Sequence, residues 1–115
     1  MAKAKKKTSR SKARSETRRH GEANYFAGRR AEYRSMDLLE RAGMLTVRAA
    51  GSKGPADIVA IGGGPPILVQ VKRGQRGITP IEREKLKAIR ARYNCMILVH
   101  RWRKHARHPE TEEIN

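Results

Sequence analysis

Four residues near the middle of this 115-residue chain combine the chemical groups needed to hold a divalent cation beside a phosphate ester. Asp57 opens one apolar segment, and Gln70, Val71 and Lys72 close the next one. Mg²⁺ takes oxygen ligands in near-octahedral geometry and usually only one or two carboxylates, while water and phosphate fill the remaining positions. The candidate ligands are therefore the Asp57 carboxylate, the Gln70 side-chain oxygen, the Val71 carbonyl and a second carboxylate at Glu32.

A cation at this place would supply phosphoryl-transfer chemistry. It makes bound water a better nucleophile and neutralises charge on the phosphate. Lys72 could position or deprotonate that water, or stabilise the charge of the pentavalent state. We predict that the catalytic residues are Asp57, Gln70, Lys72 and Glu32. Structural alternatives exist, because Asp57 could be a turn residue, Lys72 could blunt a strand end and Glu32 could be a solvated helix residue.

The segments that carry these residues read as two consecutive strands. Asp57–Ile61 and Ile67–Lys72 are apolar, and a turn rich in glycine and proline separates them. Strand side chains alternate between faces, so Gln70 and Lys72 share one face. If the two strands pair antiparallel, Asp57 lies near Gln70 and Lys72 at one end of a sheet.

The flanking elements predict an α/β fold with a central mixed sheet. Residues 28–42 read as an amphipathic helix, which Gly43 ends, and Leu45–Arg48 as a short strand. Thr79, Pro80 and Glu82 form a helix start with a capping box. That second helix should run to about Arg92, with Ile81, Leu86 and Ile89 on or near its buried face. Cys95–Val99 reads as a further core strand, and the chain beyond Arg101 is polar, with Trp102 expected to pack.

Charge indicates a polyanion partner, and nucleic acid is the most plausible one. Lys and Arg number 27 against 11 Asp and Glu, which gives a net charge of +16. The first 20 residues hold nine of these cations and one acid, Glu16. We expect residues 1–21 to form a disordered basic tail that tracks a phosphate backbone, or merely aids solubility, and residues 22–115 to form one folded domain.

Composition also bounds the location of the protein. The sequence has no apolar run long enough for a membrane span and no secretory signal. A single cysteine, Cys95, suits a reducing compartment. We expect a cytoplasmic protein, in a prokaryote or a virus-infected host cell, with no membrane partner and no small-molecule cofactor.

The motif Asp57 … Gln70-Val71-Lys72 resembles that of the PD-(D/E)XK nuclease superfamily. The surrounding runs 28–32, 38–43, 47–60 and 67–72 sharpen the match, and together they resemble the archaeal Holliday junction resolvase family. The resemblance spans about residues 28–99. It implies a PD-(D/E)XK nuclease-like fold, a homodimer and the resolution of four-way DNA junctions by paired symmetric cuts, in DNA recombination and repair. It also implies Mg²⁺ as the cofactor, for which Mn²⁺ can substitute.

The resemblance carries roles to individual residues. Asp57 corresponds to the main metal ligand, Lys72 to the catalytic lysine and Glu32 to the acid of the first helix. Arg48 corresponds to an arginine that contacts the scissile region, and Ser52 to a serine that holds the DNA backbone. We add the nearby cations as candidate DNA contacts; the full candidate set is Arg29, Arg30, Arg48, Ser52, Arg73 and Arg76.

Two departures from the family pattern bear on activity. Gln70 stands where the family usually has Glu, which removes one negative charge and should weaken Mg²⁺ binding. Tyr33 stands where members often have Arg. The alternatives are a catalytically impaired junction-binding protein and a related nuclease that acts on other branched or duplex DNA. The second helix and the strand Cys95–Val99 are the candidate dimer seam.

Overall fold

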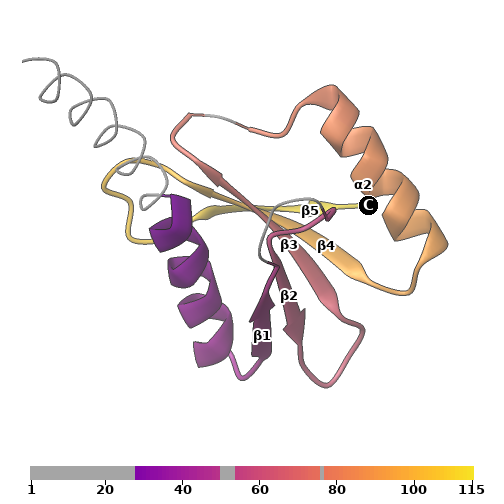
Figure 1. Ribbon diagram of the computed structural model, residues 1–115, viewed down its shortest axis with the longest axis horizontal. Helices are drawn as coiled ribbons and strands as arrows, with labels where there is room; N and C mark the ends of the chain where they lie inside the picture. The colour runs from indigo at the N-terminus through magenta and orange to yellow at the C-terminus, as the bar shows by residue number, and fades with distance from the viewer. Residues whose placement is uncertain (1–27, 50–53, 76) are drawn as a thin grey trace, which may run out of the picture.

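A five-stranded mixed sheet is the centre of the computed structural model, which describes residues 28–49, 54–75 and 77–115 (Figure 1). The strands lie in the order β1 (Leu45–Arg48), β2 (Ile58–Ile61), β3 (Ile67–Arg73), β4 (Met96–Trp102) and β5 (Glu110–Ile114). Residues 28–41 form a helix before β1, and α2 (Pro80–Arg92) links β3 to β4. The α/β class with a mixed sheet flanked by helices is confirmed. The expected tail, residues 1–21, lies outside the described residues.

The two strands that carry the candidate chemistry pair as the sequence predicts. β2 and β3 run antiparallel, with Ile58 opposite Val69 and Ala60 opposite Ile67. β3 and β4 run parallel, which requires the crossover that α2 provides. The remaining neighbours, β1 with β2 and β4 with β5, are antiparallel. The start of β2 and the end of β3 therefore lie side by side at one end of the sheet.

Apolar side chains on the two faces of the sheet form separate clusters. Leu39 of the helix over residues 28–41 packs against Ile58, Ala60, Ile67 and Val69. On the opposite face, Leu86 of α2 packs in a second cluster with Cys95, Ile97, Val99 and Ile114. The two helices thus cover different faces, as Figure 1 shows. Cys95 and Trp102, both 5% exposed or less, are core residues as predicted.

The start of α2 and the end of the helix over residues 28–41 have the capping residues that the sequence predicted. The Thr79 side chain accepts a hydrogen bond from the Glu82 N–H, and the Glu82 carboxylate accepts one from the Thr79 N–H, which completes the capping box. Gly43 has a φ of +93°, the left-handed conformation expected just after a helix. One burial prediction is wrong: Ile81 is 70% exposed, because five residues at 3.6 per turn place it about 140° around the helix axis from the buried Leu86.

The sequence analysis missed β5. Four of its five residues, in the run ETEEI, are exposed and polar, so alternation gives almost no signal. Ile114 alone is buried, at 1% exposure, and it anchors the strand in the α2 cluster. The carboxylates of this edge strand pair with arginines instead of entering the core. None of the described helices is both long and apolar enough to cross a membrane.

A buried polar network joins the helix over residues 28–41 to β4. The Trp102 indole N–H donates to Ser35 Oγ at 2.7 Å, and Ser35 Oγ lies 3.0 Å from Nδ1 of His100. The indole N–H only donates, so the Ser35 hydroxyl accepts from it, and the direction of the hydrogen bond between Ser35 and His100 depends on the His100 tautomer. Burial lowers the pKa of His100 below its usual 6.5, because the charged imidazolium loses its water.

The burial of His100 makes stability depend on pH. A base whose pKa is lower in the folded state binds protons more readily when unfolded, so its contribution is complete above pH 6.5 and is lost as pH falls through that value. We expect the free energy of unfolding, measured with urea, to decrease between pH 7.5 and pH 5. His100→Asn should be less sensitive over that range, whereas His108→Gln, at an exposed site, should behave as wild type. Equal pH dependence in all three proteins would contradict the role of His100.

Candidate active site

Asp57 is fixed at the junction of β2 and β3 by main-chain and side-chain bonds. Its N–H donates to the Val69 carbonyl at 2.9 Å, and its carboxylate Oδ2 accepts the Val71 N–H at 2.8 Å. The second bond uses one carboxylate oxygen and sets the direction of the other. In a strand, the N–H and carbonyl of one residue point toward the same neighbour. The Val71 carbonyl therefore points toward the side on which Asp57 lies.

Gln70 and Lys72 lie on the face of the sheet that α2 covers. They alternate with Val69 and Val71, which belong to the cluster beneath the other helix. Lys72 Nζ donates to Glu82 Oε2 at 2.9 Å, and the two side chains are 21% and 35% exposed. This contact places the lysine between the end of β3 and the first turn of α2.

Glu82 is a site residue that sequence reasoning assigned only to helix capping. One of its oxygens accepts the Thr79 N–H and the other accepts the Lys72 ammonium. The Lys72 hydrogen bond, and secondarily that of Thr79, holds the pKa of Glu82 below its ordinary value. The capping box was readable from the sequence, but ten residues of chain separate Glu82 from Lys72, and nothing in the spacing shows that they meet.

Glu32 contacts Arg48. The Glu32 carboxylate lies 3.1 Å from a guanidinium nitrogen of Arg48, and both side chains are about one-fifth exposed. Arg48 pairs with Ile58, whose side chain lies in the cluster beneath the helix over residues 28–41, so this ion pair is on the opposite face from Lys72. The described contacts of Glu32 do not include Asp57 or Lys72. Its role as a metal ligand stays a prediction.

Two arginines contact Tyr33, which is one of the two departures from the family pattern. The Tyr33 ring centroid lies 5.9 Å from the Arg29 guanidinium and 5.5 Å from that of Arg48. Arg29 also donates a hydrogen bond to the phenol oxygen, and together with the Arg48 charge it lowers the Tyr33 pKa. The helix therefore presents a cationic surface at this position although it lacks an arginine there.

The predicted DNA contacts fall into three groups. Arg29 and Arg48 lie around Tyr33, and Arg30 and Arg73 lie near the end of β3 on the side of the helix over residues 28–41. Ser52 and Arg76 lie outside the described residues. The structure thus divides the described cations between two places, and sequence reasoning had not separated them.

The oxygen atoms at the start of β2 and the end of β3 suit a hard cation as its ligands. The Asp57 carboxylate, the Gln70 amide oxygen and the Val71 carbonyl are oxygen donors on neighbouring or paired backbone positions, which is the chemistry that Mg²⁺ requires. Within residues 28–49, 54–75 and 77–115, no three His, Cys, Asp or Glu side chains gather as a metal cluster. A cation here would accordingly depend on one carboxylate plus neutral oxygens, water and phosphate.

No protein-family model matches the sequence, and no curated protein matches it. The structure, in contrast, matches a solved one. The Holliday junction resolvase of the archaeal hyperthermophile Archaeoglobus fulgidus aligns with a TM-score of 0.63 at 23% sequence identity, over 76% of this chain and 73% of that one. The chain has the fold of an archaeal Holliday junction resolvase. At this identity the likeness establishes the fold.

The resolvase fold confirms the resemblance that the sequence motifs predicted. The sequence identity is low, so the match shows the fold and not the roles of individual residues. Within this fold, β2 and β3 pair antiparallel as the sequence predicted, and Asp57 is bonded to the end of β3.

Proposed function

We propose that the protein is a structure-selective endodeoxyribonuclease that resolves four-way DNA junctions by metal-dependent phosphodiester hydrolysis. The observation that carries the proposal is that Asp57 is bonded to Val69 and Val71, the two strand positions that flank Gln70 and precede Lys72, in a resolvase fold. The net charge of +16 suits a DNA substrate. Recognition would depend on junction shape and phosphate placement, because phosphate contacts position a protein without reading sequence.

Asp57, Gln70 and the Val71 carbonyl would hold the cation, which supplies charge neutralisation and an activated water. In hydrolysis the water oxygen bonds to phosphorus, the bond from phosphorus to the leaving deoxyribose oxygen breaks, and that oxygen takes up a proton. Lys72 would orient the phosphate and stabilise its developing charge. Glu82 would hold Lys72 in place through the ion pair at 2.9 Å.

Two cuts per junction call for two active sites. A four-way junction has approximate two-fold symmetry, and a two-fold homodimer provides two sites at a fixed separation. We therefore propose a homodimer. Equilibrium sedimentation should give a mass near twice 13.0 kDa.

Gln70 supports a second candidate function. The amide keeps an oxygen but lacks the charge of a carboxylate, and a protein that grips junctions without cutting them is the other outcome of that change. Asp57 and Lys72 both remain, which favours activity. The two candidates differ in one measurable property, because both bind junctions and only one cleaves them.

The deciding experiment uses a labelled four-way junction and a linear duplex of matched sequence, each with Mg²⁺, Mn²⁺ or EDTA. We expect metal-dependent paired cuts in the junction alone. Cutting of the duplex or of flapped DNA to the same extent would indicate another nuclease. Tight junction binding without cleavage in either metal would favour the second candidate, and failure to bind DNA would contradict both.

Restoring the charge at residue 70 should strengthen metal binding. We expect Gln70→Glu to lower the Mg²⁺ concentration for half-maximal cleavage roughly tenfold, since affinity in such sites rises with ligand charge. Mn²⁺ binding, followed by electron paramagnetic resonance without DNA, should tighten in parallel. Asn94→Asp, which adds the same charge at an exposed residue between α2 and β4, is the control. Unchanged Mn²⁺ binding in Gln70→Glu would show that residue 70 is not a ligand.

A further inference from the structure

A cationic groove lies between the helix over residues 28–41 and the connection from β4 to β5. Its volume is about 1070 Å³. Of the twelve lining residues, six are Lys or Arg and none is Asp or Glu. The six cations are Arg30, Arg34, Lys72, Arg73, Arg103 and Lys104. Such a concentration of one charge is costly unless an anionic partner occupies the groove.

Interior contacts hold the two walls of the groove in place. Arg34, on the helix wall, donates a hydrogen bond to the Ala106 carbonyl at 2.6 Å. Its guanidinium also lies 4.1 Å from the Trp102 ring centroid, and the Trp102 indole is bonded to Ser35 of the same helix. Arg34 and Trp102 therefore tie the helix to the connection, and these ties do not involve Arg30 or Lys104.

The second wall is a tight turn that presents Lys104. The Ala106 N–H donates to the Arg103 carbonyl at 3.1 Å, and His105 has a φ of +63°, a conformation that side-chain-bearing residues seldom adopt. Sequence reasoning gave this polar connection no function. The structure places it opposite Arg30.

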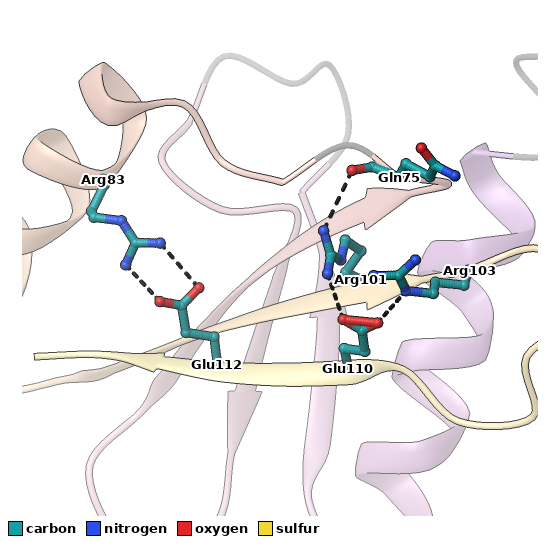
Figure 2. Close-up of polar contacts among 6 residues, drawn as sticks. All are labelled: Gln75, Arg83, Arg101, Arg103, Glu110 and Glu112. Carbon is teal, nitrogen blue, oxygen red and sulfur yellow. Dashed lines mark hydrogen bonds and ion pairs between the residues drawn. The ribbon is translucent and has the colours of Figure 1, made fainter.

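Acidic side chains do not neutralise most of these cations. Two of the six are paired: Lys72 with Glu82, and Arg103 with Glu110, which also binds Arg101 (Figure 2). Glu112 binds Arg83, outside the groove. Arg103 and Arg101 hold the pKa of Glu110 at about 2, so this pairing persists over the usual pH range. Within the described part of the chain, Arg30, Arg73 and Lys104 form no ion pair. The groove therefore stays positive while the β5 edge is balanced.

We infer that this groove binds the sugar-phosphate backbone of one arm of the DNA substrate. The inference rests on the proposed function and names where the DNA arm lies. The floor of the groove includes Lys72 and Arg73 at the end of β3, so a backbone held there continues toward the candidate active site. The first 20 residues carry nine cations and one acid, so their charge has the same sign as that of the groove and does not complement it.

The test compares two double variants that remove the same charge. Arg30→Ala/Lys104→Ala removes one cation from each wall. Lys85→Ala/Lys87→Ala removes two exposed cations from α2, which does not line the groove. The affinity for a labelled four-way junction is measured in EDTA over a range of KCl concentrations. Neither residue pair belongs to the metal site, so binding is read without cleavage.

We expect the groove variant to bind more weakly and to flatten the plot of log affinity against log salt by roughly two units, since each lost phosphate contact removes about 0.9. The α2 variant should keep the wild-type slope. Equal losses in both variants, or no loss in the groove variant, would overturn the inference while leaving the proposed function intact. A wild-type protein that binds no DNA would contradict the proposed function itself.

Discussion

Asp57→Asn is expected to abolish junction cleavage while leaving junction binding unchanged. Asparagine keeps an oxygen that can accept the Val71 N–H, so the β2–β3 junction should stay folded. The substitution removes the one charged oxygen among the three donors proposed at the end of the β2–β3 pair. The charge stabilisation that a metal supplies is worth several kcal/mol, and each 1.4 kcal/mol is tenfold in rate, so the cleavage rate should fall about a thousandfold or more.

Single-turnover cleavage and binding in EDTA, measured on the same junction, check this expectation. Asp37→Asn is the matched control, because Asp37 is an exposed acid paired only with Arg41 on the helix surface. It should cleave as wild type does. A parallel loss of binding and cleavage in Asp57→Asn, with a lowered thermal midpoint, would mean that Asp57 serves the fold instead of the reaction.

Lys72→Met is expected to produce the second largest loss, about a hundred- to a thousandfold in cleavage rate. Methionine fills the apolar part of the lysine side chain and removes the ammonium that would stabilise the developing phosphate charge, and the loss of one such group typically costs that much. Glu82→Gln should have a smaller effect of the same kind. Glutamine at this helix position also completes a capping box, so α2 keeps its start while Lys72 loses its charged anchor.

The Lys72→Met and Glu82→Gln variants together show whether Glu82 positions Lys72 or has a separate structural role. If Glu82 acts through Lys72, the double variant Lys72→Met/Glu82→Gln should cleave no more slowly than Lys72→Met alone. Additive losses would assign Glu82 an independent function. Lys87→Met and Glu84→Gln alter another lysine–glutamate pair of α2, at 3.8 Å on the exposed surface, and should leave the rate constant unchanged. Near-normal cleavage by Lys72→Met would remove Lys72 from the mechanism.

The helix signals and strand patterns were local, and so they could be read from the sequence. Thr79, Pro80 and Glu82 predicted the start of α2 because capping depends on neighbours a few residues apart. The apolar segments after Asp57 and before Lys72 predicted β2 and β3, and the short glycine-rich turn between them predicted their antiparallel pairing. Ile81 was placed wrongly, because it lies about 140° around the helix axis from Leu86, the buried residue of α2.

Contacts between distant segments could not be read in this way. β5 was missed because its exposed polar residues carry no alternation; antiparallel pairing with β4 and the burial of Ile114 against α2 hold it in place. The Ser35–His100–Trp102 network joins residues 65 or more positions apart. No spacing rule relates such residues, since their proximity results from the packing of the helix on β4.

By itself the sequence determined the fold class, the strand pair that brings Asp57 to Gln70 and Lys72, and the excess of positive charge. Each of these depends on local propensity, alternation or composition, which are properties of neighbouring residues or of the whole chain. Only the tertiary structure decided that Glu82 binds Lys72, that Glu32 binds Arg48 on the other face, and that Arg30 faces Lys104 across a groove. These contacts depend on which face of the sheet each helix covers, and that is settled by burying both apolar clusters at once.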